Sequence, residues 1–251
     1  MFMRANFLSI RRFILKYFVP ELIWPKYIFL DRTRIKVRNT PYSFGVKWLL
    51  TRRSDDYELA ERSFISGLSK GDHVLEFGGS IGVVTALIAS QIGPTGRVVS
   101  IEASTELAEY SKSWLEKSDN TKVICAYAFP VFKSISMTAS FDGSAGSLGG
   151  IVSFESINDS SKKIDENHFF LEDAFKIKEF KPKVLFIDIE GSEQIMLDHK
   201  PDIPKGINQI VIELHPSIYG KEVNQKIIQV ILDEGFVLAE RDDSVYQFLR
   251  G

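Results

Sequence analysis

The chain has one cysteine, Cys125, four histidines and no long run of apolar residues among its 251 residues. A single cysteine cannot form a disulfide within the chain, so a reducing compartment, the cytoplasm, is expected. No stretch approaches the roughly 20 apolar residues that a membrane-spanning helix needs. No Cys/His pairs stand at zinc-ligand spacing. What remains is an ordinary globular composition, with 44% hydrophobic and 25% charged residues.

The near-neutral net charge of −2 hides an asymmetry along the chain. Residues 1–53 contain twelve Lys or Arg and two acids, whereas residues 54–251 contain nineteen bases and thirty-one acids. This predicts a basic, aromatic N-terminal segment (1–53) and a main domain (54–251). Because residues 6–18 are imperfectly amphipathic, we expect the segment to be helical and to dock on the main domain or on a second copy of the chain. Peripheral contact with an anionic membrane at its inner face is the alternative.

The main domain alternates buried strands with helices. Such an order is typical of a parallel sheet covered on both faces, and a final hairpin adds antiparallel strands. We therefore predict an α/β, doubly wound, Rossmann-like sheet of seven mostly parallel strands with a C-terminal antiparallel hairpin. The expected strands are 73–77, 97–101, 121–126, 183–188, 208–214, 235–240 and 244–249. The expected helices are 56–68, 81–92, 104–117, 171–177, 192–197 and 222–234.

A variable insertion at about 131–170 interrupts this order. It is rich in Ser and Gly, and its alternating residues 135–141 predict one strand. Long irregular stretches inside compact domains often serve as lids or substrate walls. We expect the loop 142–168 to form part of the wall of the acceptor site.

The first strand ends in a glycine-rich turn, Glu76-Phe-Gly78-Gly79-Ser80-Ile-Gly82. A dinucleotide-binding turn needs glycines at relative positions 0, 2 and 5, and counting from either Gly78 or Gly79 fails. The acid Glu76 would also repel a diphosphate. Since ligands bind beyond the carboxyl ends of such strands, the turn favours a cationic or hydroxyl-bearing ligand.

A second acid, Glu102, ends the next strand, where it can accept hydrogen bonds from both hydroxyls of a ribose. The two motifs, 76–82 and 98–102, resemble the first and second motifs of class I S-adenosylmethionine-dependent methyltransferases, with Ser80 in place of the common middle glycine. The resemblance implies S-adenosylmethionine as cofactor, with Glu76 near its methionine amino group and Glu102 on its ribose. The implied cofactor-binding set is Glu76, Gly78, Gly79, Ser80, Gly82, Glu102, Ala103, Ala126 and Asp188.

Three later motifs carry a narrower resemblance. They are Leu171-Glu-Asp-Ala-Phe175, Val184-Leu-Phe-Ile-Asp188-Ile-Glu190-Gly-Ser-Glu193 and Ile210-Val-Ile-Glu213-Leu-His215-Pro216. In order and spacing they resemble the FkbM family, whose members are mostly O-methyltransferases acting on sugars, polyketides and related natural products. This resemblance extends over about residues 56–240.

Asp188 follows one expected strand and His215 the next, so the two should lie side by side. A hydroxyl that receives a methyl group must lose its proton, and histidine titrates near neutrality. We therefore expect His215 to act as base, with Asp188 or Glu190 orienting it or binding the acceptor; otherwise His215 only caps its strand. These acids, with Glu193 and Glu213, could bind Mg²⁺. Glu190 and Glu193 could instead stabilise the N-terminus of a helix. A metal is therefore possible but not predicted.

The predicted function is O-methylation of a hydroxyl on a sugar, glycan precursor or natural product. One alternative is a non-catalytic or membrane-associated glycan-assembly protein that keeps the nucleoside-binding fold. A nicotinamide-dependent oxidoreductase is disfavoured by the glycine spacing. Nucleic acid is not an expected partner, and homo-oligomerisation is open.

Overall fold

The computed structural model of the protein describes residues 21–52, 57–132, 137–142, 151–156 and 168–251. None of the helices within these residues has the length and apolarity that crossing a membrane requires.

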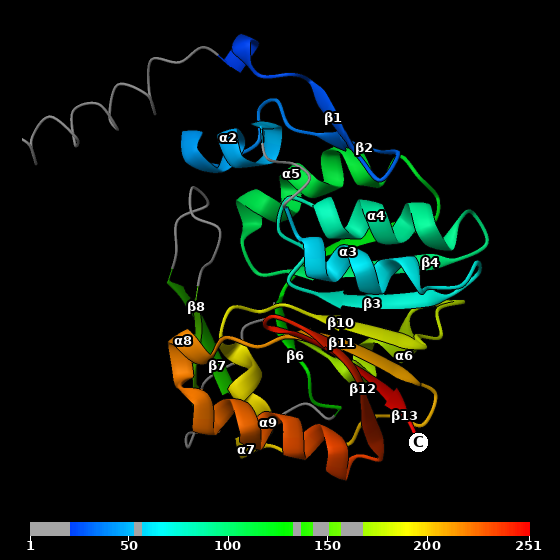
Figure 1. The fold of residues 1–251 in the computed structure, drawn as a ribbon, viewed down its shortest axis with the longest axis vertical. Coiled ribbons are helices and arrows are strands. Elements are labelled where there is room, and N and C mark those ends of the chain that lie inside the picture. The colour runs from blue at the N-terminus through cyan, green and yellow to red at the C-terminus, as the bar shows by residue number, and fades with distance from the viewer. Residues whose placement is uncertain (1–20, 53–56, 133–136, 143–150, 157–167) are drawn as a thin grey trace, which may run out of the picture.

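The core of the molecule is a seven-stranded sheet of order β12-β13-β11-β10-β3-β4-β5 (Figure 1). Five strands are parallel, and β12 and β13 form the antiparallel hairpin that joins the sheet at β11. This confirms the predicted fold class. The strands are β3 (His73–Phe77), β4 (Arg97–Glu102), β5 (Thr121–Cys125), β10 (Val184–Ile187), β11 (Gln209–Glu213), β12 (Phe236–Asp242) and β13 (Val245–Arg250).

Helices cover both faces of this sheet (Figure 1). Alternate strand residues point to opposite faces, so Val74 packs in the core under α3, α4 and α5 while Leu75 packs in the core on the other side. The helices of the first face are α3 (Leu59–Ser66), α4 (Val83–Ile92) and α5 (Thr105–Leu115). The other elements are α6 (Leu171–Lys176), the 3-10 turn η3 (Ser192–Gln194), α7 (Ile195–Asp198), α8 (Pro216–Tyr219) and α9 (Lys221–Asp233).

The N-terminal segment differs from its prediction. Its described part contains a turn, η1 (Glu21–Ile23), a hairpin of β1 (Tyr27–Leu30) and β2 (Thr33–Lys36), and one helix, α2 (Phe44–Arg52). The described part is therefore not helical throughout, and the docking role of the segment stays a prediction. This part lies over α4 and α5 (Figure 1), and the predicted helix at 6–18 falls outside the described residues.

Two small strand pairs lie in the insertion or directly beside it. A parallel pair joins β6 (Tyr127–Phe129) to β9 (His168–Phe170), and an antiparallel pair joins β7 (Met137–Asp142) to β8 (Ile151–Ser156). The strand predicted around 135–141 is thus present as β7. Most of the expected acceptor-wall loop, 143–150 and 157–167, lies outside the described residues.

Candidate active site

The glycine turn after β3 brings the main chain of two strands into contact. Gly78 has a φ of +94°, and a Cβ atom on it would lie 1.5 Å from the carbonyl oxygen of Asp188. The amides of Gly78 and Gly79 donate to the carbonyl of Ile101, at 2.9 and 3.2 Å. Only glycine fits at position 78, because the backbone beyond β10 occupies the space of a side chain. Residues 78–82 thus touch the segment that carries Asp188. We call them the cofactor turn, after the role that the sequence predicts for them.

Glu102 ties the cofactor turn to the loop after β4. It is 7% exposed, and its two carboxylate oxygens accept from the amides of Ser80 and Ser104, each at 2.7 Å. Burial raises the pKa of Glu102, and the backbone donors oppose that rise. Ala103 is half-buried in the same loop, and Ala126 packs in the core while its amide donates to the Glu102 carbonyl at 3.0 Å. Each carboxylate oxygen keeps a second lone pair for a ligand hydroxyl.

Glu76 lies beneath the cofactor turn rather than at its surface. Its side chain is 3% exposed, and its Oε2 accepts from the Thr85 hydroxyl at 2.6 Å. Its Oε1 has no hydrogen-bond partner among the described residues. With Gly78, Asp188 and Glu213 it lines a cavity of about 20 Å³, enough for one water molecule. Burial raises the pKa of Glu76 to about 7.

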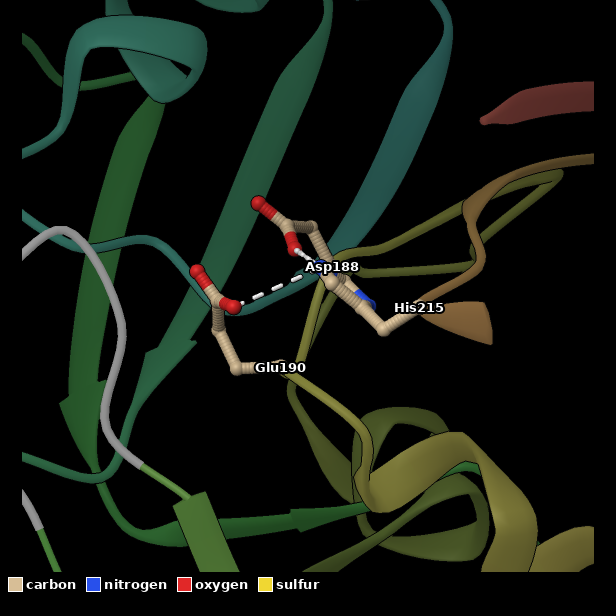
Figure 2. A group of neighbouring side chains, drawn as sticks. All are labelled: Asp188, Glu190 and His215. Atoms are coloured by element: carbon tan, nitrogen blue, oxygen red, sulfur yellow. Dashed lines mark ion pairs between the residues drawn. The ribbon is translucent and has the colours of Figure 1, made fainter. Parts of the chain in front are cut away.

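The three predicted catalytic residues lie together at the carboxyl ends of β10 and β11 (Figure 2). His215 Nε2 is 3.6 Å from Asp188 Oδ1 and 3.4 Å from Glu190 Oε2. Asp188 Oδ1 is inaccessible to solvent and has no hydrogen-bond partner among the described residues, although the side chain as a whole is 38% exposed. We call Asp188, Glu190 and His215 the acceptor group, after the role that the sequence predicts for them.

Glu193 orients the imidazole, a role that the sequence did not indicate. Its side chain is fully buried, and its Oε1 accepts from the Ile189 amide at 3.2 Å and lies 3.2 Å from His215 Nδ1. An ionised carboxylate can only accept, so a proton on Nδ1 donates to Glu193. Nε2 faces the carboxyl groups of Asp188 and Glu190, which favour a second proton there, and its lone pair is free only in the neutral imidazole. Burial disfavours the imidazolium, but Glu193, Glu190 and Glu213 together outweigh it and raise the pKa of His215.

A second acidic group, Glu58, Glu61 and Glu213, lies beside the acceptor group. Its carboxylates come within 4.8 Å of one another. Burial and mutual repulsion raise the pKa of Glu58 to about 7 and that of Glu61 to about 8. Burial and the acids around it, Glu213 first, hold the pKa of Asp188 well above its ordinary value. The sequence offered one signal for Glu58 and Glu61, namely acids in the early part of a predicted helix.

Within the part of the chain that the structure describes, two sets of side chains could hold a metal ion: the acceptor group and the second acidic group. Oxygen and imidazole ligands suit Mg²⁺ or Mn²⁺. With the same atoms, however, the acceptor group can also hold and move a proton, because Nε2 faces two carboxylates.

Sequence comparison links the first half of the main domain to methyltransferases. Residues 54–129 match the family model of protein-L-isoaspartate(D-aspartate) O-methyltransferase. A protein-L-isoaspartate O-methyltransferase of Methanococcus aeolicus is 40% identical over 81 residues, which cover 29% of this chain and 38% of the relative. The protein-L-isoaspartate O-methyltransferase of Thermotoga maritima is 29% identical over 132 residues, which cover 47% of this chain and 42% of the relative. The chain thus spans about two fifths of the length of these curated relatives.

Solved structures of similar shape are also methyltransferases or their relatives. Aeropyrum pernix fibrillarin, solved with natively bound S-adenosyl-L-methionine, has 16% identity and a TM-score of 0.47 over 76% of this chain and 73% of its own. A TehB-like S-adenosylmethionine-dependent methyltransferase of Corynebacterium glutamicum has 13% identity and a TM-score of 0.44 over 83% of this chain and 96% of its own.

The sheet order and the matched sequence together identify a Rossmann-like methyltransferase fold. The matched residues include the cofactor turn and Glu102, in agreement with the predicted class of enzyme. The match to the family model ends at residue 129, before Asp188, Glu190 and His215. None of these matches concerns the FkbM family, so that narrower resemblance stays a prediction.

Proposed function

We propose that the protein is an S-adenosylmethionine-dependent O-methyltransferase that acts on a neutral hydroxyl. The observation that carries this proposal is the contact of Gly78 with the carbonyl of Asp188. It joins a turn whose sequence matches methyltransferases to a group that can accept a proton. A methyl donor on the turn and an acceptor hydroxyl at Asp188 would therefore be neighbours, as in-line transfer requires.

The cofactor would lie along the carboxyl ends of β3, β4 and β10. Glu76 offers an unpaired carboxylate oxygen for the methionine ammonium, either directly or through the water-sized cavity, and Glu102 offers lone pairs for the ribose hydroxyls. The backbone of the cofactor turn and of Ala103 and Asp188 would line the rest, with Ala126 beneath the adenine end. S-adenosylmethionine supplies an electrophilic methyl group on a sulfonium.

The protein's part in the transfer is to position the hydroxyl and to take its proton. Transfer would form a bond between the acceptor oxygen and the methyl carbon and break the carbon–sulfur bond, whose electron pair would stay on sulfur. The hydroxyl proton passes to His215 Nε2, whose lone pair is held in place by the bond from Nδ1 to Glu193. Asp188 and Glu190 then stabilise the imidazolium that forms.

The charge of the site favours a hydroxyl over a carboxylate acceptor. Asp188, Glu190, Glu213 and Glu58 lie around the place where the acceptor would bind. Burial, together with repulsion between neighbouring acids, raises the pKa values of Asp188, Glu190 and Glu58. Another anion would add to that repulsion. A sugar, glycan precursor or natural product with a free hydroxyl fits this chemistry.

Methylation of a protein carboxyl group is the second candidate, because the family model and both curated relatives bear that name. A carboxylate acceptor has no proton to lose, so this reaction would not need His215. Transfer from radiolabelled S-adenosylmethionine to an isoaspartyl peptide and to a panel of glycans separates the two acceptors. His215→Gln should abolish hydroxyl methylation, whereas the matched control His199→Gln, at the end of α7, should not. Labelling of the peptide alone, unaffected by His215→Gln, would establish the second candidate.

Two further alternatives have direct tests. Thermal stabilisation by S-adenosylhomocysteine but not by NAD would set aside a nicotinamide-dependent oxidoreductase, whereas a folded protein that binds neither would favour a non-catalytic scaffold. Flotation with anionic liposomes, for the full chain and for a chain lacking residues 1–53, tests the proposed membrane contact of the N-terminal segment.

A further inference from the structure

Tyr42 connects the N-terminal segment to the cofactor turn. It lies in the loop between β2 and α2, before residues 54–129 that match the family model, and it is 4% exposed. Its hydroxyl forms a short hydrogen bond with the hydroxyl of Ser80. Burial raises the pKa of Tyr42 to about 12, so this hydroxyl keeps its proton throughout the physiological range.

Ser80 needs to be held in place. Its φ of +47° lies in the left-handed region, which costs a residue with a side chain on the order of 1 kcal/mol. Its amide donates to Glu102 at 2.7 Å, and its side chain is bonded to Tyr42. The conformation of the cofactor turn is thus fixed from two sides, by Glu102 through the backbone and by Tyr42 through the side chain.

The loop that carries Tyr42 is itself anchored. The hydroxyl of Tyr110, on α5, donates to the carbonyls of Lys36 and Arg38 at 3.1 and 3.3 Å. The ammonium of Lys36 donates to Ser113, also on α5, at 3.0 Å. Since α5 begins just after Glu102, one helix positions both the acid and the loop that bear on Ser80.

We propose that Tyr42 is a positioning residue of the cofactor site. Its hydroxyl holds Ser80 in the left-handed conformation. In this conformation the Ser80 amide donates to Glu102, and the cofactor turn is open to the ligand. The described part of the N-terminal segment then contributes to the conformation of the cofactor site and does not only pack on α4 and α5. This inference rests on the proposed function in one respect, namely that the ligand of the turn is S-adenosylmethionine.

The test uses the full chain and two tyrosine variants. Tyr42→Phe removes the hydroxyl and keeps the ring in the core, and Tyr110→Phe removes a hydroxyl that anchors the same loop without touching the turn. Calorimetric titration with S-adenosylhomocysteine should show a Kd about three- to tenfold higher for Tyr42→Phe, the loss expected for one hydrogen bond. Tyr110→Phe should change the Kd less than twofold. The Michaelis constant for S-adenosylmethionine should rise with Tyr42→Phe while kcat stays close to that of the wild type.

Ser80→Ala, alone and combined with Tyr42→Phe in a double variant, provides a second test. If the two hydroxyls act through each other, the double variant should bind no more weakly than Tyr42→Phe alone. Additive losses, an unchanged Kd for Tyr42→Phe, or equal losses for the two tyrosine variants would overturn the proposal.

Hydrogen exchange of the ligand-free protein tests the role of Tyr42 independently of the proposed function. Faster exchange of the Ser80 amide in Tyr42→Phe, with no change in Tyr110→Phe, is expected whatever the ligand. Absence of S-adenosylhomocysteine binding by the wild type would refute the cofactor, whereas unchanged exchange in Tyr42→Phe would refute the role of Tyr42.

Discussion

The buried carboxyl of Glu76 makes the stability of the protein depend on pH in a way that one substitution can isolate. Burial raises its pKa from 4.5 to about 7. Its contribution to the free energy of unfolding is therefore fully present below pH 4.5 and is lost as the pH rises through about 7. At 1.36 kcal/mol per pKa unit, the whole loss is roughly 3 kcal/mol, and about 2 kcal/mol of it falls between pH 5.5 and 8.5.

Glu76→Gln keeps the shape of the side chain and cannot ionise. The difference in unfolding free energy between variant and wild type should therefore shift in favour of the variant by about 2 kcal/mol from pH 5.5 to 8.5. For a domain of this size, this corresponds to a relative shift in Tm of roughly 4–8 °C. The absolute stability of the variant also depends on how its amide is hydrogen-bonded in place of Oε1, but that part is independent of pH.

Thermal or denaturant unfolding of the ligand-free protein at both pH values measures this difference. Glu106→Gln, which neutralises an exposed acid on α5, is the matched control and should follow the wild type. A Glu76→Gln curve parallel to that of the wild type would show that Glu76 is already ionised in the folded protein, and would contradict the reasoning. S-adenosylhomocysteine should bind the variant at least about tenfold more weakly, because the amide of Gln offers its ammonium an acceptor oxygen without the negative charge of the proposed Glu76 contact.

Three further predictions concern the acceptor group and the cofactor turn. Since the pKa of His215 is raised above 6.5, kcat/KM for the methylated acceptor should increase as the pH rises through that raised value. His215→Gln should lose this increase with pH and most of the activity. Micromolar Zn²⁺ should inhibit by binding Nε2 beside Asp188 and Glu190, whereas EDTA should leave the rate unchanged; loss of activity with EDTA, restored by Mg²⁺, would instead make the group a metal site. Gly78→Ala should unfold the protein or lower its stability by more than about 4 kcal/mol, because the added Cβ would overlap the Asp188 carbonyl, as circular dichroism and thermal melts can show.

The sheet was predictable because each of its strands carries its own signal. Buried β-branched runs such as 97–101 and 208–214 end at turns or acids, and their alternation with helices permits few topologies. The adjacency of Asp188 and His215 followed from the same logic, since both come just after strands that pair in parallel.

The hairpin of β1 and β2 could not be predicted in this way. Its strands have four residues each, and its turn places Asp31 and Arg32 at φ values of 43° and 66°. Hairpin turns with two positive φ angles usually reveal themselves through Asn-Gly or Asp-Gly, and neither is present at this position. The only element predicted in this segment was the imperfectly amphipathic helix at 6–18, so the hairpin was missed.

Other parts of the site depend on tertiary contacts that no local pattern encodes. Glu58 and Glu61 come to Glu213 because α3 packs beside the end of β11, across about 150 positions of sequence. Tyr42 contacts Ser80 across 38 positions of sequence. Glu193 stands five positions after Asp188, but its partner His215 follows on the next strand.

The acids of the acceptor group also help to distinguish a hydroxyl acceptor from a carboxylate acceptor. Methyl transfer removes a positive charge from sulfur, and with a hydroxyl acceptor that charge reappears as a proton on His215. Carboxylates at 3.4 and 3.6 Å from Nε2 stabilise the charge where it arrives, so they favour the transition state over the ground state. With a carboxylate acceptor, the charge of the sulfonium is cancelled by the acceptor itself and no charge arrives at His215. Acids around the imidazole would then only repel the substrate, so their arrangement fits the transfer of a methyl group to a hydroxyl.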